Sequence, residues 1–131
     1  MRKIFVDSSY VIDYLRGKEY TKELVEKIKG KQLEACISVV TLFELYIGAL
    51  LSINQKNKVE DIATLLSWFQ IVDIDKEVML LAAKIHVDLR KSGITIGIQD
   101  ILIAASSISM NMALLTNNKK HFEKIRGLHL E

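Results

Sequence analysis

The sequence predicts an α/β fold in which a short parallel β-sheet is covered by helices on both faces. Short apolar runs, each long enough for a buried strand, alternate with longer segments of helical periodicity. The chain has 131 residues, about the size of one domain, and it contains no proline, so no proline-rich linker divides it. Half of the residues are hydrophobic and 26% are charged, which is a globular composition and excludes a disordered chain.

The first four elements follow from apolar runs and their end signals. Residues 4–6 form an apolar run closed by polar residues, which predicts a fully buried strand. The apolar residues of 10–15 share one helical face, and Gly17 marks the end of that helix. We expect a second helix over 20–29, with lysines outside, and a second buried strand over 33–37.

The middle of the chain predicts four more helices and a strand. A strongly apolar helix is expected over 41–53 and another over 59–69, where leucine and isoleucine recur at helical spacing. Residues 71–74 form the third apolar run and hence the third strand. An amphipathic helix is expected over 77–91, and a helix rich in small residues over 100–110.

The last predicted strand is 113–116, and a fifth at 128–130 is left open. In parallel sheets, ligands bind beyond the carboxyl ends of the strands. The polar segments that follow the first and fourth strands are 7–9 and 116–118. We therefore expect the chemistry of this protein at these two segments.

Charge and cysteine content narrow the classes of function. A net charge of +2 neither demands nor excludes a nucleic-acid partner. Cys36 is the only cysteine, so no intrachain disulfide and no all-cysteine zinc site can form, and a reducing, cytoplasmic location is expected. The three histidines His86, His121 and His129 show no ligand spacing. No run approaches 18 apolar residues, so we expect no membrane span.

Three carboxylates occupy apolar surroundings: Asp7, Glu44 and Asp100. Carboxylates are rarely buried unless they are paired or bind a metal, and no cation lies within these three segments. Two carboxylates 4 Å apart repel each other by about 4 kcal/mol at an effective dielectric constant of 20. A cluster of the three therefore needs a cation or raised pKa values, and hard divalent cations prefer such oxygen ligands.

Each carboxylate alone also has a structural interpretation. Asp7 could cap the first helix, and Asp100 could be a favourable charge in the first turn of its helix. Thr41 and Glu44 fit the spacing of a capping box. Taken singly these roles are favoured. Taken together, the three residues fall where strand ends and helix starts converge, which favours a metal site.

Four segments of the chain form a recognisable pattern by their order and spacing. They are residues 5–9, 38–45, 100–105 and 114–118, the last leading to His121-Phe122, together with Gly93-Ile94 before Asp100. In this pattern the chain resembles the PIN-domain family, and within it the VapC-type toxins of bacterial and archaeal toxin–antitoxin pairs. The resemblance runs from Ile4 to Leu128 and depends on all the segments rather than on any one of them.

The resemblance implies a single PIN domain over residues 1–131, with a PIN-like three-layer α/β/α fold, that acts as a metal-dependent endoribonuclease. Matched to the family motif, Asp7, Glu44 and Asp100 form the acidic triad that holds Mg²⁺ or Mn²⁺. Asp7 and Asp100 are implied as direct ligands, and Glu44 ligates directly or through a water. The implied cleavage leaves a 5′-phosphate and a 3′-hydroxyl.

A fourth polar position of the family falls on Asn118, or alternatively on Asn117, where many members have an aspartate. An asparagine lacks the charge, so a second metal would be held more weakly. Ser9 and Thr116 are expected either to orient the carboxylates or to make ordinary hydrogen bonds in turns.

The family also implies an RNA substrate, a cognate VapB-type antitoxin that covers the active site, and a homodimer. Basic residues near the acidic centre could form a rim that binds RNA, although each alone is more simply a solvated surface charge: Arg90, Lys91, Lys119, Lys120, Lys124 and Arg126. Large apolar residues could lie in protein interfaces, although core packing is favoured for each: Tyr46, Leu50, Leu51, Trp68 and Phe69.

Three other interpretations stay open. The first is a PIN ribonuclease of RNA processing that has no antitoxin. The second is a non-catalytic PIN-like module that binds RNA or protein, in which Asn118 marks a lost activity. The third is a phosphoacceptor receiver domain, which ranks last because only a single acid, Asp7, follows the first strand.

Overall fold

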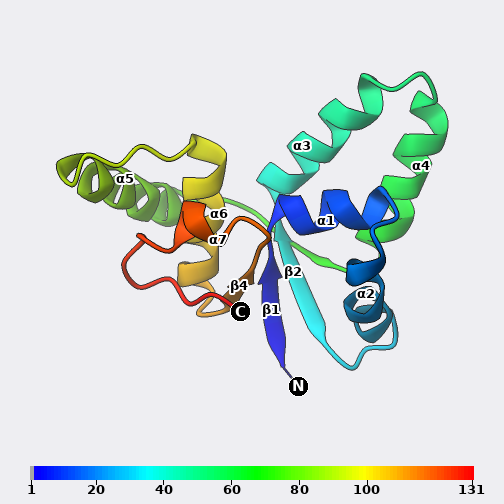
Figure 1. Cartoon of the computed structure of the whole chain (residues 1–131), viewed down its shortest axis with the longest axis horizontal. Helices are drawn as coiled ribbons and strands as arrows, with labels where there is room; N and C mark the ends of the chain where they lie inside the picture. Colours follow the sequence, from blue (N-terminus) through cyan, green and yellow to red (C-terminus); the bar gives the residue numbers. More distant parts are fainter. Residues whose placement is uncertain (1) are drawn as a thin grey trace.

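A four-stranded parallel sheet lies between two layers of helices, as the sequence predicts (Figure 1). The computed structural model describes residues 2–131. Its elements in chain order are β1 (Lys3–Val6), α1 (Ser8–Leu15), the 3₁₀ helix η1 (Glu19–Thr21), α2 (Lys22–Lys29), β2 (Glu34–Ser38), α3 (Val39–Leu50), α4 (Gln55–Leu66), β3 (Gln70–Val72), α5 (Lys76–Lys91), α6 (Ile98–Ser109), β4 (Ala113–Leu115) and α7 (Lys119–Phe122).

The strand order is β3-β2-β1-β4, so β1 lies at the centre of the sheet. Phe5 of β1 is opposite Cys36 of β2 on one side and Leu114 of β4 on the other. The chain leaves β1 toward β2 and β3 and later returns to the other side of β1 as β4. The carboxyl ends of β1 and β4 therefore frame the crevice where strand order reverses, which is the usual ligand site of such sheets.

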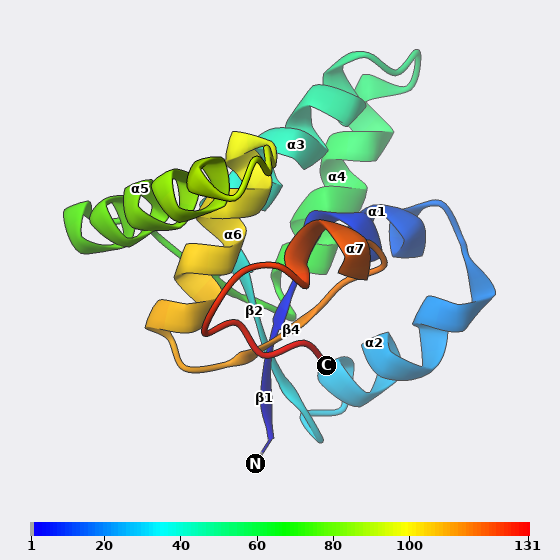
Figure 2. The same cartoon turned by 60° about the vertical axis from the view of Figure 1, so that its left-hand side comes forward.

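Alternation along the strands divides the core into two halves. Phe5 and Cys36 point to the face covered by α5, α6 and α7. Ile4, Val6 and Ile37 point to the opposite face, which α1, α2, α3 and α4 cover. Figures 1 and 2 show these two helical layers on either side of the sheet. Both faces of β1 and β2 are buried after their first residues, which explains why these two strands are continuous apolar runs in the sequence.

Several predicted boundaries were wrong by a few residues. The third predicted helix begins at Val39 rather than Thr41, because the Ser38 side chain caps it by accepting the Val40 N–H. The helix carrying Asp100 begins two residues earlier, at Ile98. The optional strand at 128–130 is reduced to a single bridge between Leu114 and Leu130.

The outer face of α3 exposes apolar side chains. Tyr46, Leu50 and Leu51 are 37%, 58% and 82% exposed, so the expectation of core packing was wrong for these three. The reason is that α3 is apolar around most of its circumference, whereas its neighbours cover only one side. Trp68 and Phe69 do pack against the core, as expected.

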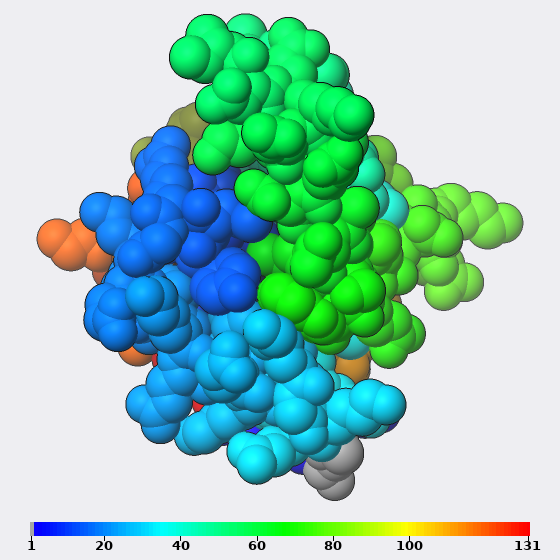
Figure 3. All heavy atoms as spheres, turned by 90° about the vertical axis from the view of Figure 1, so that its right-hand side faces the viewer, coloured from blue at the N-terminus to red at the C-terminus, as the bar shows by residue number. Residues whose placement is uncertain are grey.

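The hairpin of α3 and α4 extends beyond the edge of the sheet (Figures 1 and 2). Figure 3 shows the face on which α1 and α2, in blue, meet α4, in green. Within residues 2–131, no helix is both long enough and apolar enough to span a membrane.

Candidate metal centre and active site

The predicted site residues gather at the crevice between the carboxyl ends of β1 and β4. The Asp7 N–H donates to the Leu115 carbonyl at 2.9 Å, which extends the pairing of the two strands by one residue. This bond brings the segment after β1 against the segment after β4. The helices α3 and α6 then contribute Glu44 and Asp100 from either helical layer.

Asp7 is 2% exposed, and its carboxylate is held by two hydroxyl groups. Ser9 Oγ donates to Asp7 Oδ2 at 2.8 Å, and Thr116 Oγ1 donates to the same oxygen at 2.7 Å. The expectation that these two hydroxyls orient a carboxylate is confirmed. Asp7 is the N-cap residue of α1, as its structural interpretation required, but its side chain makes no capping bond to that helix. Both hydroxyl donors use Oδ2, so Oδ1 remains available to a ligand.

Glu44 is held by a hydroxyl relay that begins in α3 and passes through α1. Ser8 Oγ donates to Glu44 Oε1 at 2.8 Å and lies 2.8 Å from Thr41 Oγ1. A serine hydroxyl has one proton to donate, so Thr41 must donate to Ser8. The capping-box interpretation of Thr41 and Glu44 was therefore wrong: α3 starts two residues earlier, and both side chains point to Ser8 instead.

Asp100 lies in the first turn of α6, as its structural interpretation required, and it also faces the site. Its side chain is 26% exposed, and Oδ2 lies 3.0 Å from Nδ1 of His121 in α7. In the sequence, His121 belongs to the motif that follows residues 114–118, but it was given no role in the site, because the three histidines show no ligand spacing. The position of His121 three residues after Asn118, next to the buried Phe122, was the available signal.

Electrostatic effects on Glu44 and Asp100 show that the carboxylates lie within range of one another. Burial raises the pKa of Glu44, the hydrogen bond from Ser8 lowers it, and the charges of Asp7 and Asp100 raise it further. Burial raises the pKa of Asp100 too, as does the charge of Asp7, while the contact with His121 opposes the rise. The folded chain thus concentrates negative charge that it does not fully neutralise.

Lysine and arginine side chains do not pair with these carboxylates in the part of the chain that the structure describes. Among the salt bridges of residues 2–131, none joins a lysine or arginine to Asp7, Glu44 or Asp100. In the same part of the chain, no three His, Cys, Asp or Glu side chains already stand close enough together to enclose a metal ion. The three carboxylates therefore influence one another through their charges but do not form a closed cluster.

The two asparagines after β4 differ in their surroundings. The side chain of Asn117 donates to Asp13 Oδ2 at 2.8 Å and to the hydroxyl of Tyr20. Its side-chain partners are therefore not Asp7, Glu44 or Asp100. Asn118 is exposed at the N-cap position of α7, and its N–H donates to Thr116 Oγ1 at 3.0 Å. The basic residues predicted for the rim are all exposed: Arg90, Lys91, Lys119, Lys120, Lys124 and Arg126.

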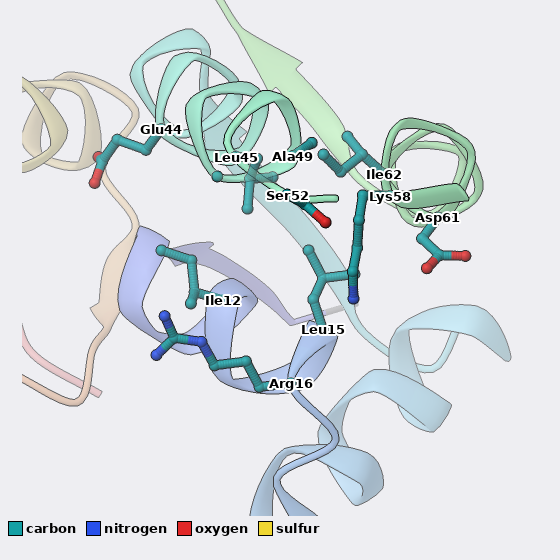
Figure 4. A pocket seen from close by; sticks show the side chains of 11 residues that line it. Ile12, Leu15, Arg16, Glu44, Leu45, Ala49, Ser52, Lys58, Asp61 and Ile62 are labelled. Atoms are coloured by element: carbon teal, nitrogen blue, oxygen red, sulfur yellow. The ribbon is translucent and has the colours of Figure 1, made fainter. Parts of the chain in front are cut away.

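A pocket of ≈ 240 Å³ lies between α1 and the α3–α4 hairpin, beside the carboxylates. Figure 4 shows Glu44 at one end, Lys58 and Asp61 at the other, and apolar side chains such as Ile12 and Leu45 between them. The pocket is thus continuous with the acidic site through Glu44.

Comparisons with known proteins found relatives that match nearly the whole chain. The PIN domain family model matches residues 4–128. Ribonuclease VapC1 of Methanocaldococcus jannaschii is 36% identical over 98% of this chain and 85% of its own length. The tRNA(fMet)-specific endonuclease VapC of Salmonella typhimurium is 27% identical over 100% of this chain and 98% of its own.

Two solved structures are similar over nearly their full length. The VapBC2 complex of Rickettsia felis, bound to a DNA fragment from its promoter, has a chain that superposes with a TM-score of 0.89 and 25% identity, covering 98% of this chain and 97% of that one. The DNA-bound VapBC complex of Salmonella typhimurium has a chain with a TM-score of 0.88 and 26% identity, covering 100% and 98%.

Proposed function

This chain belongs to the PIN-domain family, and on that premise we propose that it is a divalent-metal-dependent endoribonuclease and the toxin of a toxin–antitoxin pair. Relatives that match it over nearly its whole length are named VapC ribonucleases, and one is named a tRNA(fMet)-specific endonuclease. Ribonucleases of this family generally depend on a divalent metal.

The observation that carries the proposal is the convergence of Asp7, Glu44 and Asp100 at the crevice of the sheet. They come from three separate elements, and the pKa values of Glu44 and Asp100 are raised partly by the charge of their neighbours. Like charges held close together destabilise the fold, so such a cluster indicates a functional site that requires them.

The donor set fits a hard divalent cation. All three groups are carboxylates, Oδ1 of Asp7 carries no hydroxyl donor, and a cation would relieve the repulsion that raises the two pKa values. We assign Asp7 and Asp100 as direct ligands of Mg²⁺ or Mn²⁺, and Glu44 as a direct or water-mediated one. Such an ion, when bound, polarises the scissile phosphate and activates a water.

The other residues hold and align these ligands. Ser9 and Thr116 keep Asp7 in one orientation, and Ser8 does the same for Glu44. Asn118 supplies the fourth polar position without a charge, so we propose that a second metal is held weakly here. The exposed lysines and arginines around α7 would bind the RNA backbone, because they carry charge and lie beside the site in sequence.

A VapB-type antitoxin is the proposed partner, because the similar solved structures are VapBC complexes. The outer face of α3 offers exposed apolar surface for protein contacts, with Phe43 62% and Leu51 82% exposed. We also propose that the protein is a homodimer and that it is cytoplasmic. The single cysteine, Cys36, is buried and unpaired, which is compatible with a reducing compartment.

The test is cleavage of total RNA by purified protein in Mg²⁺, in Mn²⁺ and in chelator. We expect cleavage only with metal, and its loss in Asp7→Asn. Isothermal titration with Mn²⁺ alone separates the alternatives. A protein that binds Mn²⁺ only through an intact Asp7 supports the assigned site, and a well-folded wild type that binds no Mn²⁺ and cleaves no RNA supports the non-catalytic module instead.

A further inference from the structure

A hydrogen-bonded cluster outside the acidic site joins three segments that are distant in sequence. Tyr20 of η1 donates its hydroxyl proton to Asp13 Oδ2 of α1. Asn117, in the loop after β4, donates one side-chain N–H to the same Asp13 oxygen at 2.8 Å and the other to the Tyr20 hydroxyl. The three side chains thus close a ring of donors and acceptors across 104 positions of sequence between Asp13 and Asn117.

The cluster needs an amide at position 117. Asp13 offers only acceptors, and the Tyr20 hydroxyl has already used its proton, so the third member must supply two N–H groups. A carboxylate there would place two negative charges side by side. This accounts for an asparagine at position 117 without any role as a metal ligand.

Tyr20 is itself 52% exposed and contacts the protein core through Tyr10. Its ring meets the ring of Tyr10 edge to face, with 5.5 Å between centroids at 89°, and Tyr10 is 8% exposed. Burial and the hydrogen bond to Asp13 raise the pKa of Tyr20 to about 12, so the phenol keeps its proton at neutral pH. The cluster is therefore attached, through Tyr10, to the helical layer formed by α1 to α4.

The same loop is linked to Asp7 by a short path. The Asn117 N–H donates to Ser9 Oγ at 3.3 Å, and Ser9 Oγ donates to Asp7 Oδ2 at 2.8 Å. Thr116, the preceding residue, is the second donor to that oxygen. Any shift of residues 116–118 away from α1 would disturb both hydroxyls that orient Asp7.

We propose that Asn117, Asp13 and Tyr20 form a latch that fixes the loop 116–118 against α1 and thereby orients Asp7 for metal binding. Asn117 is then a positioning residue, and the fourth polar position of the site belongs to Asn118. The inference depends on the proposed function for its catalytic consequence, but the latch itself can be measured without activity.

The experiment compares Asn117→Ala and Tyr20→Phe with wild type. Tyr20→Phe keeps the ring that packs on Tyr10 and removes only the hydroxyl. The matched control is Tyr14→Phe, since Tyr14 also lies in the first helical layer but packs edge-on against Trp68. The measurements are Mn²⁺ affinity by isothermal titration, kcat and KM on RNA, and thermal unfolding.

We expect both variants to lower Mn²⁺ affinity and kcat by about tenfold, the lower end of the effect of removing a group that supports a ligand. KM for RNA should stay within twofold, because the latch contacts no substrate, and the double variant should be no worse than the more affected single one. Affinity and kcat within twofold of wild type in both variants would overturn the latch. A change in KM alone would also overturn it, and would make Asn117 an RNA contact.

Hydrogen exchange of the Asn118 amide provides the readout that is independent of activity. This N–H is bonded to Thr116 Oγ1, so loosening the loop in Tyr20→Phe should speed its exchange at least fivefold, with no change in Tyr14→Phe. Unchanged exchange contradicts the latch even if the enzyme is active. If wild type neither binds Mn²⁺ nor cleaves RNA, the proposed function fails, while faster exchange in Tyr20→Phe still supports the latch.

Discussion

Thr116→Val is the substitution that tests most directly how Asp7 is held. Valine has nearly the same shape as threonine but lacks the hydroxyl that donates to Asp7 Oδ2 at 2.7 Å. Thr116 is 4% exposed and Asp7 is 2% exposed, so water does not readily replace the lost donor. Ser9 remains as the other donor.

The size of the effect follows from the charge of the acceptor. A hydrogen bond to a charged group contributes about 1.5–3 kcal/mol. The entropy of unfolding of about 2.1 cal/mol/K per residue amounts to about 0.28 kcal/mol/K over this chain. Thr116→Val should therefore lower the Tm by about 5–11 °C. The N–H of Asn118 also loses its acceptor, but that residue is exposed and water can replace the bond.

The assay is thermal unfolding followed by circular dichroism at pH 7 in chelator. Thr116→Ser keeps the hydroxyl and should remain close to wild type. Thr64→Val is a matched control, since it removes a hydroxyl that donates to the Glu60 carbonyl on an exposed helix face, and we expect a change below about 0.5 kcal/mol. If Thr116→Val unfolds at the same temperature as Thr116→Ser, the hydroxyl does not hold Asp7 and the reasoning is refuted.

The remaining predictions concern charge and packing. Burial and neighbouring carboxylates raise the pKa of Glu44 in the folded state. The contribution of Glu44 to the stability of the folded protein is therefore greatest below the ordinary carboxyl pKa, and it is lost as pH rises through the raised pKa. Without metal at pH 7, Glu44→Gln should be more stable than wild type by about 0.5–2 kcal/mol, and its Tm should depend less on pH. An equal pH dependence in both proteins would contradict this. Phe122→Ala removes a fully buried ring that anchors α7, and urea unfolding should show a loss of about 3–5 kcal/mol. Leu45→Ala should lower the free energy of unfolding by about 2–5 kcal/mol. Leu51→Ala, on the exposed side of the same hairpin, should lower it by less than about 0.5 kcal/mol. Similar losses in the two variants would mean that the face carrying Leu51 is covered.

The sheet was predictable because its central strands, β1 and β2, are buried on both faces. Ile4, Phe5 and Val6 form an uninterrupted apolar run, and such runs between helices indicate a parallel sheet. The strand order β3-β2-β1-β4 was not predicted, although it determines that Asp7 and Thr116 meet. Strand order depends on which helices cover which face, and no local window of sequence contains that information.

Local patterns were misleading where a tertiary contact competed with them. Thr41 and Glu44 have capping-box spacing, yet Ser8, 33 residues before Thr41, takes both side chains into its own hydrogen bonds. Leu50 and Leu51 continue an apolar helix for which core packing was predicted, yet α3 is covered on one side only. In both cases the sequence pattern is present, but contacts with other elements determine what the side chains do.

The sequence by itself determined the fold class and the family, and it singled out the three carboxylates for the proposed site, because each of these depends on short segments: apolar runs, helix starts and motifs of a few residues. Only the tertiary structure decided which groups surround those carboxylates. His121 reaches Asp100 across 21 residues, Thr116 reaches Asp7 across 109, and Asn117 reaches Tyr20 across 97. Hydrogen bonds of this range exist only after the strands have been ordered and the helices packed, so the physical cause of each lies in the assembled fold.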